Sequence, residues 1–243
     1  MQYCNAIPTQ SSTMKLVVAG CSVSDRTRVD TAYGEILADS IGYDYVHHGA
    51  GCGSNYRIWK KLTQMLMSGQ LTENDIVLVQ YTSMDRQEFW SDTLAPEFHR
   101  YSMHDKNIEL RELNNGGNIV RYKSFVYGEG KIENQFLEMY EKYFNNIEYN
   151  RELFATNHFL FHNTMDKYGI KIFYITFEDT DTHNFYAYVG QEQPLFQTTN
   201  EQHINITNIE SKYCLEDKGH FSQQGHNYVA KVLEQKLKDR GVI

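Results

Sequence analysis

Long apolar runs and an excess of basic residues are missing from this chain of 243 residues. No window approaches the roughly 18 apolar residues that a membrane-spanning helix needs, so the sequence predicts no membrane span. Lysine and arginine number 23 against 31 aspartate and glutamate residues, which gives a net charge of −8. An acidic chain has no general attraction for the phosphate backbone, and we therefore expect no nucleic-acid partner.

Clustered cysteines and a leader segment are also missing. The four cysteines show neither a CxxC pair nor a zinc-ligand spacing, so we expect free thiols, with no disulfide framework and no metal site. The first residues, "MQYCNAIPTQSSTM", contain no basic stretch followed by an apolar stretch, which predicts no signal peptide. We therefore expect a cytoplasmic protein, and a bacterial or a viral context would both suit it.

What the chain does contain is an alternation of strand and helix patterns. The predicted strands cover 15–20, 43–48, 75–81 and 170–177. The predicted helices cover 30–42, 56–69, 133–168 with a break near 145–148, and 223–239. This alternation favours α/β architecture: one doubly wound, flavodoxin-like three-layer α/β/α domain with a mainly parallel sheet.

A single domain accounts for most of the chain. We expect an N-terminal tail over 1–13 and one domain over 14–243, with long insertions at about 89–131 and 178–216. The first insertion contains "IELRELNNGGNIVRYKSF", two alternating runs on either side of an Asn-Asn-Gly-Gly turn, which predicts a β-hairpin. Long insertions in a compact sheet usually build a site or an interface.

Four segments follow predicted strands or precede the last helix, where ligands bind in doubly wound sheets. They are "GCSVS" from Gly20, "GAGCGSN" from Gly49, "YTSMDR" from Tyr81 and "DKGHFS" from Asp217. A serine, an aspartate and a histidine occur in these segments in that chain order. The order is compatible with a nucleophile, an orienting carboxylate and a general base that the fold brings together. A helix cap is the alternative interpretation of the serine.

The first and last of these segments resemble those of one family. "GCSVS" is similar to the Gly-Asp-Ser block of the SGNH (GDSL-type) hydrolases, with Cys21 in place of the usual Asp. "DKGHFSQQGHNYVAKVL" is similar to the family's closing Asp-x-x-His block and the helix after it. The resemblance covers essentially the whole chain. It implies that Ser22 is the nucleophile, that His220 is the general base and that Asp217 orients it.

The resemblance also implies an oxyanion hole. In the family, the nucleophile's own N–H, a glycine N–H of the second block and an asparagine of the third block stabilise the oxyanion. Here Ser22 supplies the first donor, and Gly53 or Gly51 supplies the second, with Gly53 favoured because a Ser-Asn pair then begins the helix. In the third block, Thr82 lies where the asparagine belongs, with Ser83 beside it.

Several residues have two interpretations at this point. Asn55 is a substitute oxyanion donor or, as we favour, a helix N-cap. Asp85 and Arg86 form a structural pair or contact substrate. His226 is interpreted as packing or capping, not as a second base. In the "GAGCGSN" segment, Ser54 replaces the third glycine of a dinucleotide loop, so we expect no nucleotide cofactor.

These expectations combine into a function. We expect a serine esterase that hydrolyses a small O-acyl ester, most simply acetyl, by way of an acyl-enzyme on Ser22 and without a cofactor. Tyrosine, phenylalanine and polar residues are mixed in both insertions, which suits an acylated glycan substrate. An acyltransferase of the same fold and a non-catalytic glycan-binding or assembly protein stay open, and so does attack by a thiolate of Cys21 or Cys52. The oligomeric state is not predicted.

Overall fold

The structure is a computed structural model, and it describes part of the chain. The described residues are 13–21, 23, 24, 26, 28–48, 54–81, 87–91, 117–121, 146–179, 201–215 and 220–243.

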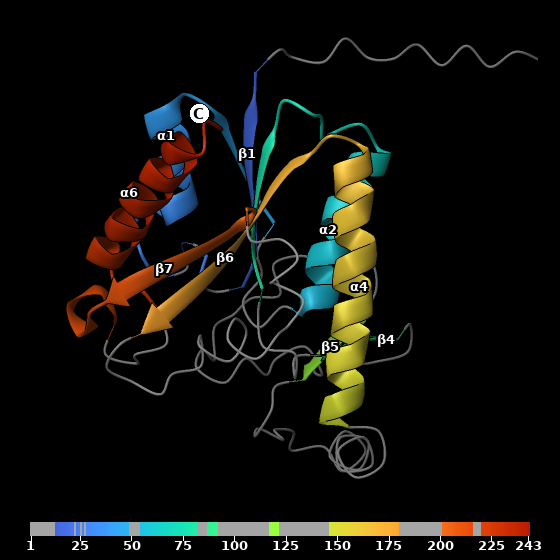
Figure 1. The fold of residues 1–243 in the computed structure, drawn as a ribbon. Helices are drawn as coiled ribbons and strands as arrows, with labels where there is room; N and C mark the ends of the chain where they lie inside the picture. The colour runs from blue at the N-terminus through green and yellow to red at the C-terminus, as the bar shows by residue number, and fades with distance from the viewer. Residues whose placement is uncertain are drawn as a thin grey trace, which may run out of the picture.

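Five strands form one parallel sheet (Figure 1). They are β1 (Lys15–Ala19), β2 (Asp44–His47), β3 (Ile76–Gln80), β6 (Lys171–Asp179) and β7 (His203–Ile209). Their order across the sheet is β2-β1-β3-β6-β7, and every neighbouring pair is parallel. This order is that of a flavodoxin-like doubly wound sheet, as the sequence predicts.

Helices cover both faces of the sheet and make three layers (Figure 1). They are α1 (Tyr33–Ile41), α2 (Asn55–Met67), α4 (Ile147–Lys167) and α6 (Gln223–Asp239). Because side chains alternate along a strand, Leu16 and Val18 of β1 pack in the layer of α1 and α6, whereas Val17 and Ala19 pack in the layer of α2 and α4. Both clusters are buried, which explains the nearly continuous apolar runs of β1 and β3.

Several helices begin or end at the residues that the sequence indicates. Helix α1 ends at Gly42, whose φ of 74° is the left-handed conformation that glycine adopts without strain. Helix α6 has the predicted bounds, and Ser222 is its N-cap. Helix α4 begins at Ile147, inside the predicted break of the long helical stretch. The remainder of that stretch lies outside the described residues.

One prediction about the insertions needs correction. The range 178–216 was expected to be an insertion, yet it contains β7, the fifth strand of the main sheet, and a short 3-10 helix, η3 (Ser211–Tyr213).

The first insertion contains a second, two-stranded sheet. The strand predicted after the Asn-Asn-Gly-Gly turn is confirmed as β5 (Gly117–Arg121), and it pairs antiparallel with β4 (Gln87–Ser91). The other predicted strand of the hairpin, 108–113, lies outside the described residues, so the hairpin itself stays a prediction.

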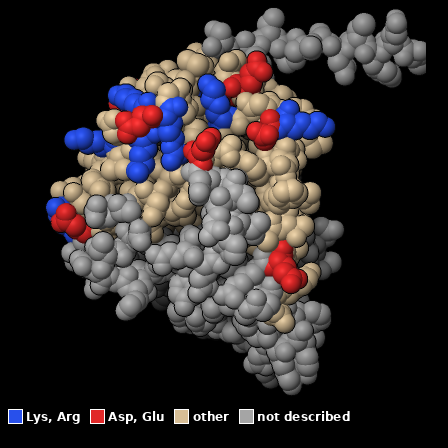
Figure 2. Space-filling model, in the orientation of Figure 1, with Lys and Arg blue, Asp and Glu red and all other residues tan. Residues whose placement is uncertain are grey.

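The described surface carries mixed charge on the face shown in Figure 2, where basic and acidic side chains lie beside one another. On α6, for example, Lys238 Nζ lies 2.5 Å from Glu234 Oε1, one helical turn away. No helix within the described part of the chain is long and apolar enough to cross a membrane.

Candidate active site

The three strands that lead into the candidate site are direct neighbours. β1 lies between β2 and β3, and both pairings are parallel, so the three carboxyl ends meet at one edge of the sheet. The segments 20–24, 49–55 and 81–86 follow these ends. β7 runs parallel to them, so the stretch that leads from it to His220 leaves the sheet at the same edge. The topology therefore brings the four sequence segments to the edge where doubly wound sheets bind ligands.

The turn after β1 is built on close packing. A Cβ atom on Gly20 would lie 2.5 Å from Ser24 Oγ and 3.0 Å from Gln80 Oε1, so only glycine fits there. The next residue, Cys21, is buried, and its Sγ lies 3.5 Å from the side-chain nitrogen of Gln80 at the end of β3. The chain is thus anchored immediately before Ser22. Gln80 was not recognised as a site residue, although it is the only polar residue between Ile76 and Tyr81.

Ser24 anchors the turn on the other side of Ser22. It is fully buried, and its hydroxyl donates to the carbonyl oxygen of Cys21 over 2.8 Å. Ser24 Oγ also lies 3.4 Å from Nε2 of His47, the last residue of β2. A serine beside a histidine could suggest a nucleophile, but a buried hydroxyl that donates to the backbone has a structural role. The buried thiol of Cys21 is equally inaccessible to a substrate.

The second segment ends at the start of α2. Ser54 is the N-cap, and its side chain accepts a hydrogen bond from the backbone N–H of Arg57 over 3.4 Å. Asn55 is the first residue of α2 and is buried. The prediction that Asn55 is the N-cap is therefore wrong by one residue, because the serine before it takes that position. The expected Ser-Asn start of the helix is confirmed.

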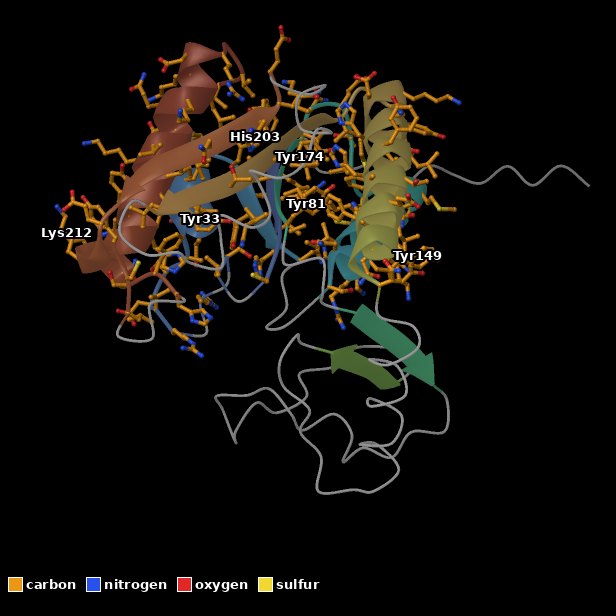
Figure 3. All side chains as sticks on the ribbon, turned by 60° about the horizontal axis from the view of Figure 1, so that its bottom comes forward. Tyr33, Tyr81, Tyr149, Tyr174, His203 and Lys212 are labelled. Carbon is orange, nitrogen blue, oxygen red and sulfur yellow. The ribbon has the colours of Figure 1, made fainter. Side chains whose placement is uncertain are left out.

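The third segment begins at Tyr81, whose hydroxyl lies in a buried polar cluster between the sheet and α4 (Figure 3). The indole N–H of Trp59 donates to this hydroxyl over 2.9 Å, and His158 Nδ1 lies 2.9 Å from it. Burial first, and then the nearby Tyr174, raise the pKa of Tyr81 well above its usual value, so the hydroxyl stays protonated. Tyr81 thereby ties the chain just before Thr82 to both helices of that layer.

The fourth segment is a loop closed by a β-bridge. Cys214 and Phe221 pair antiparallel, and the N–H of Leu215 donates to the carbonyl oxygen of His220 over 2.8 Å. His220 is half-buried and comes two residues before the N-cap of α6. The backbone of the proposed base is therefore held by its own loop. Asp217 lies in this loop but outside the described residues.

The loop is pressed against the first turn of α6. Ser222 accepts a hydrogen bond from the N–H of Gly225 over 3.2 Å, and its own N–H donates to the carbonyl oxygen of Tyr213 over 2.8 Å. A Cβ atom on Gly225 would overlap that same carbonyl oxygen. Gly225 is therefore required by the close approach of the two backbones and not by its φ angle.

His226 lies one turn into α6 and caps another helix. Its Nδ1 accepts a hydrogen bond from the backbone N–H of Tyr33, the first residue of α1, over 3.0 Å. The ring stacks on Tyr33 at a centroid distance of 5.8 Å and is buried. Burial, and then the charge of His220, lower the pKa of His226 to about 4. The interpretation as a capping and packing residue is confirmed.

Of the ten residues predicted for the site, the structure describes His220 and Asn55. The others lie outside the described residues: Ser22, Gly51, Gly53, Thr82, Ser83, Asp85, Arg86 and Asp217. Within the described residues, no group of three or more histidine, cysteine, aspartate or glutamate side chains could hold a metal ion. What the structure tests is therefore the scaffold around the site, and the roles of these side chains remain predictions.

Comparisons with known proteins identify the fold. No family model matches the chain, and no curated protein matches it in sequence. Among solved structures, a protein from Desulfitobacterium hafniense assigned to the lipolytic G-D-S-L family shares 8% identity at a TM-score of 0.51, covering 92% of this chain and 99% of that one. The psychrotrophic esterase EstA from a Pseudoalteromonas species, inhibited by monoethylphosphonate, shares 10% identity at a TM-score of 0.50, covering 93% and 97%. The chain therefore has the fold of the SGNH, or GDSL-type, hydrolases.

Proposed function

Given this fold, we propose that the chain is a serine esterase whose nucleophile is Ser22. The observation that carries the proposal is the anchoring of the chain on both sides of Ser22, by Cys21 and Ser24, at the edge where the loop of His220 also lies. A nucleophile needs a rigidly held turn, and because the hydroxyl of Ser24 is buried and bonded to the backbone, we assign the nucleophile to Ser22, the other serine of this segment.

The reaction follows from the roles of the three side chains. His220 takes the proton of Ser22 as its oxygen attacks the ester carbonyl carbon, and Asp217 holds the imidazole and stabilises its charged form. When the tetrahedral intermediate collapses, the bond to the alcohol breaks and His220 returns the proton to the leaving oxygen. Water then attacks the acyl-enzyme with His220 again as the base, and the acid is released.

The oxyanion is stabilised by donors at the ends of three strands. The N–H of Ser22 and the N–H of Gly53, with Gly51 as the other candidate, supply two donors. The hydroxyl of Thr82, or of Ser83 beside it, supplies the third in place of the family's asparagine. Asn55 is the remaining candidate, since it begins α2 directly after the glycine segment. Removal of one good donor costs on the order of 10²–10³ in rate, so single substitutions identify which donors act.

The substrate we favour is a carbohydrate that carries a small O-acyl group such as acetyl. Aromatic residues mixed with asparagine, glutamine and histidine in 89–131 and 180–200 suit stacking on sugar rings together with hydrogen bonds to hydroxyl groups. Asp85 and Arg86 follow the third strand end and are proposed to contact this substrate. A sugar acceptor in place of water would make the same chemistry a transacylation.

Turnover of p-nitrophenyl acetate and labelling by a fluorophosphonate test the proposal. We expect one labelled residue, Ser22, and loss of both labelling and turnover in Ser22→Ala. Ser24→Ala is the matched control, because it removes a serine hydroxyl two residues away that is buried and bonded to the backbone. Labelling at another residue, or undiminished turnover in Ser22→Ala, would contradict the proposal.

A non-catalytic binding protein is the second candidate, because the third segment lacks the family's asparagine. Pure wild-type protein would then neither turn over p-nitrophenyl acetate nor react with the fluorophosphonate, yet it would bind an acetylated oligosaccharide in calorimetry. Asp217→Asn separates the two cases further. In the enzyme, this substitution should preserve the fold and lower kcat by several orders of magnitude, because the amide favours the wrong tautomer of His220.

A further inference from the structure

The first turn of α6 is bonded to the segment that joins the Ser22 turn to α1. The backbone N–H of Thr31 donates to Gln223 Oε1 over 3.1 Å, and Gln223 Nε2 donates back to the carbonyl oxygen of Thr31 over 3.0 Å. The backbone N–H of Tyr33 donates to His226 Nδ1 over 3.0 Å. We call these four residues, Thr31, Tyr33, Gln223 and His226, the α1–α6 latch.

The latch replaces a local helix cap. The N-cap position of α1 is occupied by Ala32, which has no side-chain acceptor and makes no capping hydrogen bond. The first N–H groups of a helix need partners, and a buried unpaired N–H is costly. His226 supplies the acceptor from 193 positions away along the chain. The start of α1 therefore depends on the position of α6.

The latch also lies between the two halves of the proposed site. On one side, Thr31 follows Ser22 by nine residues through the segment that leads to α1. On the other, Gln223 follows His220 by three residues and is the first residue of α6. Any change in the latch moves the segment of the nucleophile relative to the loop of the base. A misplacement of about 1 Å in such a pair can cost on the order of 100-fold in rate.

The latch needs a neutral imidazole. Nδ1 of His226 accepts a hydrogen bond from the N–H of Tyr33, so the proton of the neutral ring is on Nε2, and a charged ring would have a donor at both nitrogens. The ring is enclosed by Tyr33, stacked at 5.8 Å, and by Phe221, edge-on at 5.8 Å. These apolar contacts disfavour the charged form.

Among the described residues, two titratable groups face His226. Tyr33 faces it from α1, and His220 faces it from the loop before α6. From β6, Phe177 packs against Tyr33 and Phe221 and carries no charge. A positive charge on His220 repels a proton on His226 and adds to the effect of burial, and together they lower the pKa of His226 to about 4.

We propose that His226 is a positioning residue, which in its neutral form holds the Ser22 segment in register with His220 and which releases that segment when it is protonated. This inference rests on the proposed function for its effect on rate, whereas the latch itself is a property of the fold. Acid then acts on the enzyme in two steps. Protonation of His220 stops catalysis reversibly, and protonation of His226 opens the arrangement of the site.

Two substitutions separate the acceptor from the ring. His226→Asn keeps an acceptor oxygen near the position of Nδ1, but asparagine has no ring and no group that titrates. His226→Phe keeps a ring that stacks on Tyr33 but leaves the N–H of Tyr33 without a partner. We expect His226→Phe to lower the fluorophosphonate labelling rate and kcat about 10- to 100-fold with little change in KM, and His226→Asn to stay within about threefold of wild type. If His226→Phe is the more active of the two, packing and not positioning is the role of His226.

His203→Phe is the matched control. Like His226→Phe, it removes an imidazole that takes part in a hydrogen bond, here between His203 Nε2 and Thr176 Oγ1 at 2.8 Å. His203, however, is the first residue of β7, at the end of the strand opposite to the site edge. Activity should be unchanged. We also compare the logarithm of the labelling rate, plotted against pH, in wild type and in His226→Asn. As the pH falls from 6 to 4, the slope of this plot should rise from one toward two in wild type and stay at one in His226→Asn. Equal slopes in the two proteins would contradict release of the segment by protonation.

Hydrogen exchange tests the latch without a substrate. At pH 7, the amide of Tyr33 should exchange slowly in wild type and in His226→Asn, and at least tenfold faster in His226→Phe. Unchanged exchange in His226→Phe would refute the latch. A wild type that is inert to ester and fluorophosphonate but shows this exchange pattern would refute the proposed function alone. If His226→Phe does not fold, Gln223→Leu is used in its place, because it leaves the backbone N–H and the carbonyl oxygen of Thr31 without partners. Unchanged exchange in Gln223→Leu would then refute the latch, and a wild type that is inert to ester and fluorophosphonate would refute the proposed function alone.

Discussion

The hydroxyl of Ser24 donates to the carbonyl oxygen of Cys21 over 2.8 Å, which closes the chain into a tight turn with Ser22 between them. Two serines, Ser22 and Ser24, follow β1 in the sequence. Ser24 is buried completely, and its hydroxyl donates to the backbone. Ser24 therefore holds the shape of the turn, whereas Ser22 is the proposed nucleophile.

Replacement of Ser24 by alanine should loosen this turn without removing the nucleophile. The carbonyl oxygen of Cys21 loses one of its two donors and keeps the backbone N–H of residue 24 at 3.0 Å, so we expect the free energy of unfolding to fall by about 1 kcal/mol. Labelling of Ser22 by a fluorophosphonate should persist at a reduced rate. Urea unfolding and labelling followed by mass spectrometry measure the two effects. Complete loss of labelling in a folded Ser24→Ala protein would show that Ser24 takes part in the chemistry.

The thiol of Cys21 should be inert in the native protein. Its side chain is 1% exposed and faces Gln80 in the interior, so iodoacetamide should modify it only when the chain unfolds. Cys21→Ala should remain active, with a loss of stability of about 1 kcal/mol or less because the cavity is small. A dead Cys21→Ala variant together with an active Ser22→Ala variant would establish a thiolate mechanism in place of the serine mechanism.

Gly225→Ala should damage both the stability and the activity. Alanine is favoured over glycine within a helix by up to about 1 kcal/mol, but here its methyl group would overlap the carbonyl oxygen of Tyr213. We expect the overlap to prevail, to displace the loop of His220, and to lower kcat at least tenfold. Gly42→Ala is the control, because it introduces strain at a φ of 74° with open space around it and is remote from the loop. It should lower stability by about 1 kcal/mol and leave kcat unchanged.

Sequence patterns predicted the layers of this fold because local signals mark them. Nearly continuous apolar runs identified β1 and β3, the helical pattern identified α6, and the glycine at position 42 marked the end of α1. β7 was missed because it lies at the edge of the sheet. Its buried isoleucines alternate with Asn205 and other polar residues, so the stretch resembles a polar insertion. Edge strands bury less and carry weaker signals.

Long-range pairing explains the other differences. The pairing of β5 with β4 was not predicted, because it depends on tertiary packing that no local pattern records. The same holds for the latch, because nothing near His226 or Tyr33 in the sequence indicates that one caps the other. The site segments were predictable for the opposite reason. Parallel topology brings all carboxyl strand ends to one edge, whatever the details of packing.

Acid should destabilise the fold through the two most buried of the described histidines, His158 and His226. Burial lowers the pKa of both His158 and His226 to about 4, from about 6.5 in the unfolded chain. Above pH 6.5 both are neutral in either state and have no effect. As the pH falls from about 6.5 to about 4, the unfolded chain binds protons that the folded chain does not. The free energy of unfolding should therefore fall, by up to roughly 3 kcal/mol for each histidine, since one pKa unit corresponds to about 1.4 kcal/mol.

Urea unfolding at pH 7.5, 6 and 4.5 measures this decline in wild type, His158→Asn and His226→Asn. Each variant loses stability at pH 7.5, because Tyr81 loses its imidazole partner or Tyr33 loses the ring stacked on it, so the comparison concerns the change with pH and not the absolute value. Asparagine does not titrate, and each variant should lose about half of the wild-type decline, with the double variant flattest. An undiminished decline in the double variant would mean that other groups, such as the half-buried His162 and His203, cause the loss of stability in acid.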